Sequence, residues 1–286
     1  MNDAFYFDRV RDHIVTCALC PHHCLIHEGK TGLCGMRLNT GGKLYAYGYG
    51  LVSSIALDPI EKKPLRQFYP GTKVLSIGGF GCNLICPFCQ NYQISREYQA
   101  RLESSEVVSP SQITSLAIES QPRGNIGVAY TYNEPLVGYE FVHDCARLVR
   151  AEGLKNILVT NGYIEEKPLR AILPYIDAMN IDLKGFTDAF YHKLGGNLQP
   201  VKDTIQIANK HCHIEVTTLV IPGENDSAEE IEALVGWLAA IDVNIPLHLT
   251  RFFPRYQYSN QKATPIDVLN RLGNIAMSHL KNVFFS

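Results

Sequence analysis

The feature that most constrains the fold is a regular alternation of apolar runs and helical patterns that begins at Lys73. Each run is short and is followed by a polar or glycine-containing loop and then by a segment with helical periodicity. The apolar runs cover 74–77, 126–130, 157–159, 178–181, 214–221 and 246–249, with 283–285 as a short seventh run. Such alternation predicts a parallel sheet, and continuous apolarity predicts strands that are covered on both faces.

Capping signals mark the starts of three of the intervening helices. They are Ser109 with Gln112, Ser227 with Glu230, and Thr264 followed by Pro265 and Asp267. Ser109, Ser227 and Thr264 have hydroxyls that can accept hydrogen bonds from the free amides of the first helical turn. Pro265 suits that turn because it has no amide hydrogen to leave unpaired. Six or seven βα-like units are fewer than the eight of a closed barrel. We therefore predict an α/β fold with an incomplete (β/α)6-type barrel, and a doubly wound open sheet is the alternative.

The first 70 residues follow a different pattern. They contain four cysteines, frequent glycine, and a tyrosine-rich stretch over 44–57 that suits antiparallel strands. We therefore predict two units, a cysteine-rich N-terminal module over 1–70 and a core domain over 71–286.

Charge and composition exclude several classes of function. The net charge of -2, from 26 basic and 28 acidic residues, gives no general attraction to nucleic acid or to anionic lipid. No run of 18 apolar residues predicts a membrane span, and the N-terminus lacks a basic leader, so a cytoplasmic location is expected. Nine cysteines in a reducing compartment are better explained as metal ligands or buried thiols than as disulfides.

Three of these cysteines, Cys82, Cys86 and Cys89, lie in one loop that follows the first apolar run. Their spacing is Cys-x3-Cys-x2-Cys. Three thiolates can bind three irons of a [4Fe-4S] cubane and leave the fourth iron open to another ligand. The alternative is a zinc knot or a set of buried structural thiols.

Polar residues also follow the next three apolar runs. Asn133 and Glu134 follow the second, Asn161 the third, and Asp182 with Lys184 the fourth. In a barrel these positions meet at the mouth formed by the carboxyl ends of the strands, where chemistry collects. Taken one by one, the alternatives are an ordinary turn at Asn161 and a rim salt bridge between Asp182 and Lys184.

Two residues near the sixth apolar run are further candidates for the barrel mouth. They are His248 and Arg251. A single histidine on an apolar strand is more often a core residue whose hydrogen bonds are satisfied, and that is the alternative for His248.

The three-cysteine loop, with the aromatic Phe88 before its last cysteine, resembles the signature of the radical S-adenosylmethionine (SAM) superfamily. The resemblance implies that the open iron chelates the methionine part of SAM. It also implies that one electron cleaves SAM to a 5'-deoxyadenosyl radical, which abstracts hydrogen. By the same resemblance the residues that contact SAM are Phe88, Asn133, Glu134, Asn161, Asp182 and Lys184. No catalytic residue is assigned.

Across nearly the whole chain, further segments resemble the radical SAM protein of the AmmeMemoRadiSam system, which is similar to pyruvate formate-lyase activating enzymes. They are Cys17–Cys24, Gly32–Gly35, Asp58–Pro64 and Thr131–Pro135. The resemblance implies a radical SAM enzyme that acts on an unidentified substrate and takes electrons from a reductant such as flavodoxin or ferredoxin.

Two alternatives to this function stay open. The first is an activating enzyme for a glycyl-radical enzyme, although the arginine and histidine of that pattern correspond here to Thr217 and the Phe252–Phe253 region. The second is a non-catalytic iron-sulfur electron carrier or redox sensor.

Four N-terminal cysteines form the other group, with the spacing Cys-x2-Cys-x3-Cys-x9-Cys. They are Cys17, Cys20, Cys24 and Cys34. Four thiolates can hold a tetrahedral zinc ion or an iron-sulfur cluster, so this spacing predicts a second metal site and leaves its metal open. The nearby His22, His23 and His27 could replace a thiolate, and reduced structural thiols are the alternative.

Overall fold

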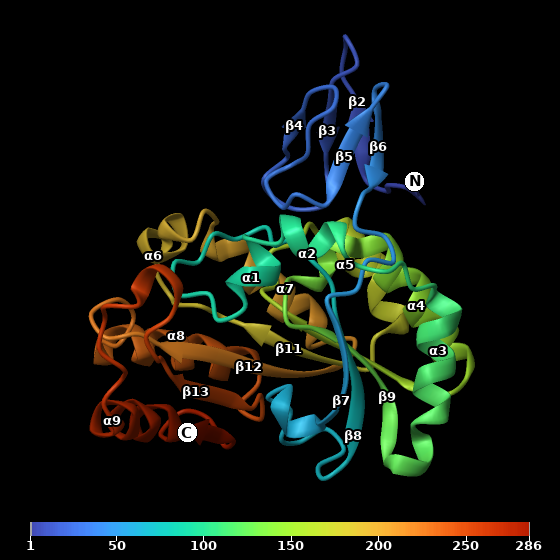
Figure 1. Cartoon of the computed structure of the whole chain (residues 1–286). Coiled ribbons are helices and arrows are strands. Elements are labelled where there is room, and N and C mark those ends of the chain that lie inside the picture. Colours follow the sequence, from blue (N-terminus) through green and yellow to red (C-terminus); the bar gives the residue numbers. More distant parts are fainter. Residues whose placement is uncertain (1, 286) are drawn as a thin grey trace.

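An eight-stranded sheet is the centre of the computed structural model, which describes residues 2–285 (Figure 1). Its strand order is β14-β13-β12-β11-β10-β9-β8-β7. The parallel strands are β8 (Lys73–Gly78), β9 (Asn125–Thr131), β10 (Lys155–Thr160), β11 (Ala178–Asp182), β12 (His213–Val220), β13 (Leu247–Arg251) and β14 (Val283–Phe285). All seven predicted apolar runs are therefore strands, and β7 (Ser54–Pro59) adds an antiparallel edge beside β8.

The sequential strand order decides between the two predicted architectures. A doubly wound sheet reverses its strand order at a switch point, whereas here each strand pairs with its neighbour in sequence. Within residues 2–285, β7 and β14 do not pair. The sheet is therefore an incomplete barrel, as predicted, and not a closed one.

Helices connect the parallel strands. The α-helices are α1 (Tyr92–Ser95), α2 (Gln99–Glu103), α3 (Pro110–Glu119), α4 (Tyr139–Ala151), α5 (Glu166–Ile172), α6 (Asp188–Lys193), α7 (Leu198–Ala208), α8 (Ala228–Ile241) and α9 (Ile266–Met277). The 3-10 helices are η1 (Ile60–Lys62), η2 (Gln121–Arg123), η3 (Pro135–Gly138), η4 (Leu173–Tyr175) and η5 (Tyr256–Tyr258). Between residues 2 and 285, no helix has both the length and the apolarity needed to cross a membrane.

Two of the three predicted helix caps are confirmed. Ser109 forms a reciprocal capping box with Gln112, and the Ser227 hydroxyl accepts from the Glu230 amide. The prediction for Thr264 is wrong, because Pro265 is the N-cap of α9. The Thr264 hydroxyl instead donates to the Val220 carbonyl at 2.6 Å, a contact between distant segments that local sequence does not reveal.

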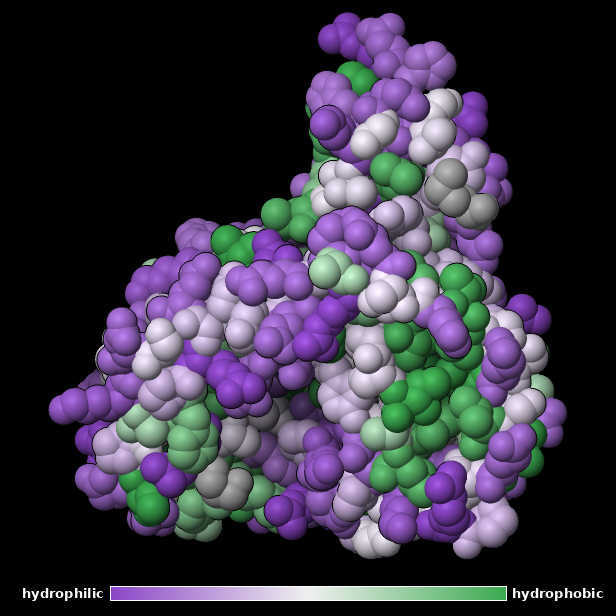
Figure 2. Space-filling model, in the orientation of Figure 1, coloured by the Kyte–Doolittle hydropathy of each residue, from purple (hydrophilic) through white to green (hydrophobic). Residues whose placement is uncertain are grey.

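Two small antiparallel sheets form a projection that stands away from the larger body and has a largely hydrophilic surface (Figures 1 and 2). One contains β1 (Asn2–Asp3), β6 (Lys43–Ala46) and β5 (Arg37–Thr40), and the other contains β2 (Phe7–Arg9), β3 (Val15–Cys17) and β4 (Leu25–Ile26). β7, from the stretch predicted to form antiparallel strands, belongs to the large sheet instead. The domain division at residue 70 stays a prediction.

A buried ion pair fixes this projection to the core. Arg37 on β5 donates through Nη1 to both carboxylate oxygens of Glu140 on α4, at 3.0 and 3.1 Å. Glu140 also accepts from the Phe5 amide at 2.6 Å. Charges are tolerated inside a protein when they are paired and hydrogen-bonded in this way.

The segment between β7 and β8 packs against the amino-terminal part of β12. The backbone amides of Arg66 and Gln67 donate to the Glu215 carboxylate at 3.0 and 2.8 Å. Asn180 on β11 donates to the Pro64 carbonyl at 2.8 Å. This segment therefore lies away from the carboxyl ends of the strands, where the polar residues gather.

Candidate functional site

The three-cysteine loop connects the carboxyl end of β8 to α1, as the sequence predicted. Cys86 is buried, Cys82 and Cys89 are partly exposed, and none of them forms a disulfide. The pKa of the Cys86 thiol is raised to about 11, mainly by burial, while the charge of Lys184 opposes the rise. The nearby cation favours the anionic form that the thiol takes when it binds metal, whereas burial opposes that form.

Asn133 holds the start of this loop. Its side-chain oxygen accepts from the Gly79 amide at 2.9 Å, and its Nδ2 donates to the carbonyls of Phe80 and Gly81 at 2.9 and 3.1 Å. Gly81 has a φ of +78°, and a Cβ there would collide with the Cys34 carbonyl oxygen. The amide that the sequence assigned to SAM is therefore engaged in shaping the loop.

Asn161 lies against the sulfur of Cys82. Its Nδ2 is 3.7 Å from Cys82 Sγ and donates to Asn83 Oδ1 at 2.9 Å, while its own oxygen accepts from the Tyr163 amide at 2.9 Å. The Leu84 amide also donates to Cys82 Sγ, at 3.4 Å. N–H donors around a ligating sulfur stabilise its thiolate form and tune the metal that it holds.

Glu134 joins the ends of β9 and β10. Its buried carboxylate accepts from the Thr160 hydroxyl at 2.8 Å, the Asn161 amide at 2.7 Å and the Leu136 amide at 3.0 Å. Burial raises the pKa of this carboxyl to about 7, and these three donors hold it from rising further. A cation placed beside Glu134 would therefore lower this pKa and favour the ionised carboxylate.

Asp182 and Lys184 lie at the end of β11. Lys184 Nζ is 2.7 Å from Asp182 Oδ2, and the ammonium also lies near the thiols of Cys86 and Cys89. Burial lowers the pKa of Lys184, but the charges of Asp182 and Cys86 outweigh that effect and raise it. The salt bridge proposed as the alternative is thus present, and it sits directly beside the three-cysteine loop.

Phe88 is buried rather than open to the mouth. Its ring is parallel to that of Phe190 on α6, with centroids 6.1 Å apart, and it is tilted against Tyr258 of η5 at 6.0 Å. These contacts anchor the second half of the three-cysteine loop against two other elements.

His248 is not a mouth residue. Its Nε2 is 2.6 Å from the Glu215 carboxylate, and its ring stacks on Phe284 inside the sheet. Arg251 ends β13 and donates from Nε to the Thr264 carbonyl at 3.0 Å. The alternative given for His248, a satisfied core histidine, is therefore correct.

Two residues that the sequence did not single out also build the site. Asn83 donates to the Tyr163 carbonyl at 2.7 Å, and Arg96 donates to the Cys82 carbonyl at 3.1 Å. Asn83 occupies a variable position of the cysteine spacing, so the motif says nothing about it. Its position next to the first cysteine was the one available signal.

The thiols of the three-cysteine loop suit a cluster better than a single ion. No three His, Cys, Asp or Glu side chains within the described part of the chain, residues 2–285, are gathered closely enough to hold one metal ion. A cubane spreads its ligands, because each thiolate binds a different iron. The N–H donors at Cys82 and the ammonium beside Cys86 fit the negative charge of such a group.

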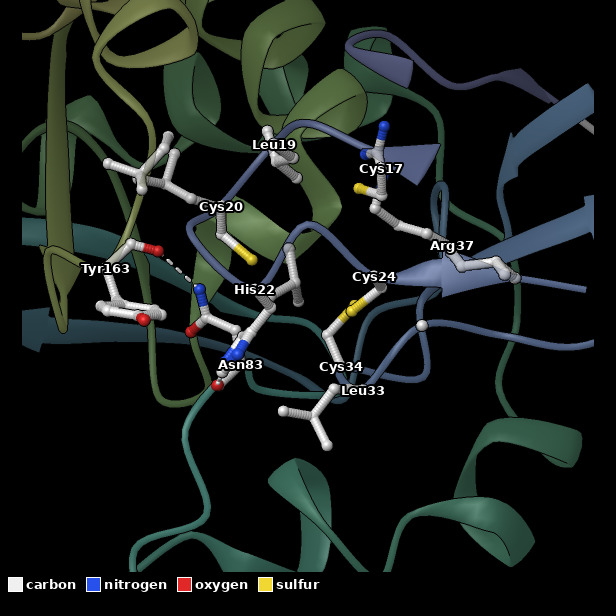
Figure 3. Close-up of a pocket in the computed structure, with 15 residues that line it drawn as sticks. Cys17, Leu19, Cys20, His22, Cys24, Leu33, Cys34, Arg37, Asn83 and Tyr163 are labelled. Atoms are coloured by element: carbon white, nitrogen blue, oxygen red, sulfur yellow. Dashed lines mark hydrogen bonds between the residues drawn. The ribbon is translucent and has the colours of Figure 1, made fainter. Parts of the chain in front are cut away.

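The N-terminal cysteines converge on a second place. Cys17, Cys20, Cys24 and Cys34 line one cavity, which Figure 3 shows in close-up. Asn83 and Tyr163 from the core also line it, so the cavity lies between the projection and the core. The structure therefore separates the seven cysteines into the two groups that their spacing predicted.

Comparison with known proteins places these features in a family. The family model described as the radical SAM superfamily matches residues 76–238. An uncharacterized protein of Methanocaldococcus jannaschii, MJ0808, is 41% identical over 288 residues, which cover 99% of this chain and 84% of that protein. The pyruvate formate-lyase 1-activating enzyme of Escherichia coli K12 is 25% identical over 54% of this chain and 63% of its own length.

Solved structures show the same fold at low identity. A radical SAM methyltransferase from Sphaerobacter thermophilus is similar with a TM-score of 0.56 and 14% identity, over 77% of this chain and 67% of that one. SuiB of Streptococcus suis bound to S-adenosylmethionine is similar with a TM-score of 0.54 and 15% identity, over 72% of this chain and 47% of that one. These likenesses support the architecture of the parallel sheet alone.

Proposed function

Since the chain belongs to the radical SAM superfamily, whose members are enzymes that use a [4Fe-4S] cluster and SAM, we propose that its three-cysteine loop holds that cluster. Cys82, Cys86 and Cys89 are the ligands in this proposal. The observation that carries it is the position of the loop at the carboxyl end of β8, beside polar residues from the ends of the next three strands. When bound, the reduced cluster and SAM supply a 5'-deoxyadenosyl radical that abstracts hydrogen from a substrate.

Glu134 receives the ammonium of SAM in this proposal. A carboxylate offers about four lone-pair positions, and three donors of the chain occupy three of those of Glu134. With a pKa of about 7, the carboxyl is partly protonated at neutral pH. A neighbouring ammonium favours its ionised form and gains a charge-assisted hydrogen bond.

Asp182 and Lys184 supply charges for the rest of the SAM molecule. Lys184 pairs with a carboxylate and Asp182 accepts from hydroxyls, the interactions that the carboxylate and ribose of SAM require. Asn133, Asn161 and Phe88 contribute by holding the loop, through the contacts to Gly79, Cys82 and Phe190. An external one-electron donor of the flavodoxin or ferredoxin class reduces the cluster.

Lys184→Ala is expected to weaken SAM binding while the visible absorption of the cluster remains. Loss of one charge-assisted hydrogen bond costs about 1.5–3 kcal/mol, which corresponds to an affinity lower by about 10- to 150-fold. Anaerobic equilibrium binding of SAM measures the change. Lys193→Ala is the matched control, because Lys193 pairs with Glu224 and is more exposed. Equal affinity in the wild type and Lys184→Ala would place Lys184 outside the SAM site.

Electron paramagnetic resonance of the reduced protein tests the proposed function. SAM added to the wild type is expected to change the spectrum of the cluster, because it binds the iron that has no protein ligand. The same addition to a Cys82→Ala/Cys86→Ala/Cys89→Ala variant should change nothing. A wild-type spectrum that is indifferent to saturating SAM would contradict the proposal.

An activating enzyme for a glycyl-radical enzyme is the second candidate, and the similarity to the Escherichia coli activating enzyme supports it. Against it, the expected arginine position holds Thr217, whose hydroxyl donates to Asn180 Oδ1 at 3.0 Å. A glycyl doublet in a partner protein after incubation with SAM and reductant would favour this candidate. Consumption of SAM with a modified small molecule would favour the first. Membership in a family of enzymes disfavours the electron-carrier alternative.

A further inference from the structure

Four cysteines line the cavity between the projection and the core (Figure 3). Cys17 ends β3, Cys20 and Cys24 follow it on one turn, and Cys34 comes from the loop before β5. All four are free of disulfides. All four line the same cavity, so the thiols form one group.

Other potential ligands at this cavity are already engaged. His22 Nε2 is 2.6 Å from the Asn83 carbonyl oxygen, and its ring packs on Tyr163 with centroids 5.1 Å apart. The Asn83 amide donates to the Tyr163 carbonyl, and its oxygen accepts from Asn161. His23 turns away and pairs with Glu165 at 3.1 Å. The four sulfurs are therefore left as the ligand set.

Arg37 brings an unused donor to the same cavity. Its side chain is almost fully buried, and its Nη1 and Nη2 bind Glu140 and the Phe5 carbonyl. Its Nε–H has no acceptor within residues 2–285. Arg37 lines this cavity together with Cys17 and Cys34. A buried donor without a partner requires an explanation, and an anionic sulfur centre in this cavity would supply one.

The arrangement of the thiols argues against a single ion. Zinc binds each thiolate sulfur at about 2.3 Å, which requires tetrahedral ligands within about 3.8 Å of one another. No three cysteines in the described part of the chain are gathered for one ion. The loop with Cys82, Cys86 and Cys89, to which the family assigns a [4Fe-4S] cluster, shares this open arrangement.

We infer that Cys17, Cys20, Cys24 and Cys34 ligate a second iron-sulfur cluster. It lies beside the first, because His22 contacts the Asn83 carbonyl and Cys34 packs on Gly81, the two neighbours of Cys82. In this inference the second cluster is a [4Fe-4S] cubane. Each of its four irons has a thiolate ligand, so none is open to SAM. Arg37 neutralises part of its charge. The inference does not depend on the cleavage of SAM.

Metal and sulfide analysis of the full-length chain, purified without oxygen, tests this second cluster. The Cys82→Ala/Cys86→Ala/Cys89→Ala variant is expected to retain about four irons and four sulfides per chain, and the wild type about eight of each. The variant with alanine at Cys17, Cys20, Cys24 and Cys34 should lose about half of the wild-type iron. Cys145→Ala/Cys212→Ala, which removes two cysteines outside both groups, is the control and should keep all of it.

Two results would overturn the inference. One is a folded triple variant without iron, and the other is one zinc per chain in place of iron and sulfide. If the triple variant does not fold, the iron content of the wild type is the test. About four irons per wild-type chain, in place of about eight, would exclude a second cluster. If the wild type fails to cleave SAM while the triple variant retains about four irons, the proposed function is contradicted and the second cluster is still supported.

Discussion

Cys86→Ala is expected to lose the cluster of the three-cysteine loop and, with it, all cleavage of SAM. The loop offers three thiolates, so removal of one leaves the cubane with two protein ligands. Cys86 is the buried member of the set and lies beside Lys184. Iron analysis and the methionine formed with dithionite and SAM measure the two losses.

Cys145→Ala is the matched control for this variant. Cys145 is buried in α4 and lies outside both groups of cysteines, so its removal should leave iron content and cleavage unchanged. Unchanged cleavage in Cys86→Ala would mean that these three cysteines do not hold the reactive cluster.

Glu215→Gln is expected to destabilise the fold by about 3 kcal/mol at neutral pH. Glu215 is buried and accepts from His213, His248 and the backbone amides of Arg66 and Gln67. Burial raises the pKa of this carboxyl, but the four donors outweigh it and lower the pKa to about 2. A fall of about 2.5 units from an ordinary carboxyl value corresponds to about 3 kcal/mol.

The stability lost in Glu215→Gln is expected to depend on pH. A lowered pKa stabilises the folded state above the unfolded value of about 4.5, and the contribution disappears as the pH falls from there toward 2. The gap in unfolding free energy between the wild type and Glu215→Gln should therefore narrow as the pH falls from about 4.5 toward 2. Urea unfolding measures it, and Glu232→Gln, which removes an exposed partner of His279, is the control. A gap that stays constant down to pH 3 would contradict this account.

The parallel sheet could be predicted because its strands are buried on both faces. The run 157–159 is continuously apolar, which predicts a strand that is covered on both faces, and it lies in β10 of the large sheet. The fate of β7 could not be predicted in the same way. Its residues suit an antiparallel strand in either sheet, and its pairing with β8 depends on contacts that local sequence does not encode.

The candidate site was predictable in its position and less so in its contacts. Strand ends that meet at one edge brought Glu134, Asn161 and Asp182 to the three-cysteine loop, because the topology of a parallel sheet requires it. The hydrogen-bond partners of these side chains could not be predicted from the sequence. Asn133 is engaged by the loop backbone, and His248 faces Glu215 from a strand 33 residues away.

The products formed from SAM test the central claim most directly. The wild-type protein, reconstituted without oxygen and reduced with dithionite, is expected to convert SAM to methionine and 5'-deoxyadenosine in equal amounts, as measured by chromatography. The expectation rests on the family and on the three-cysteine loop at the carboxyl end of β8. A protein that carries a reducible cluster, binds SAM and forms neither product would contradict the account.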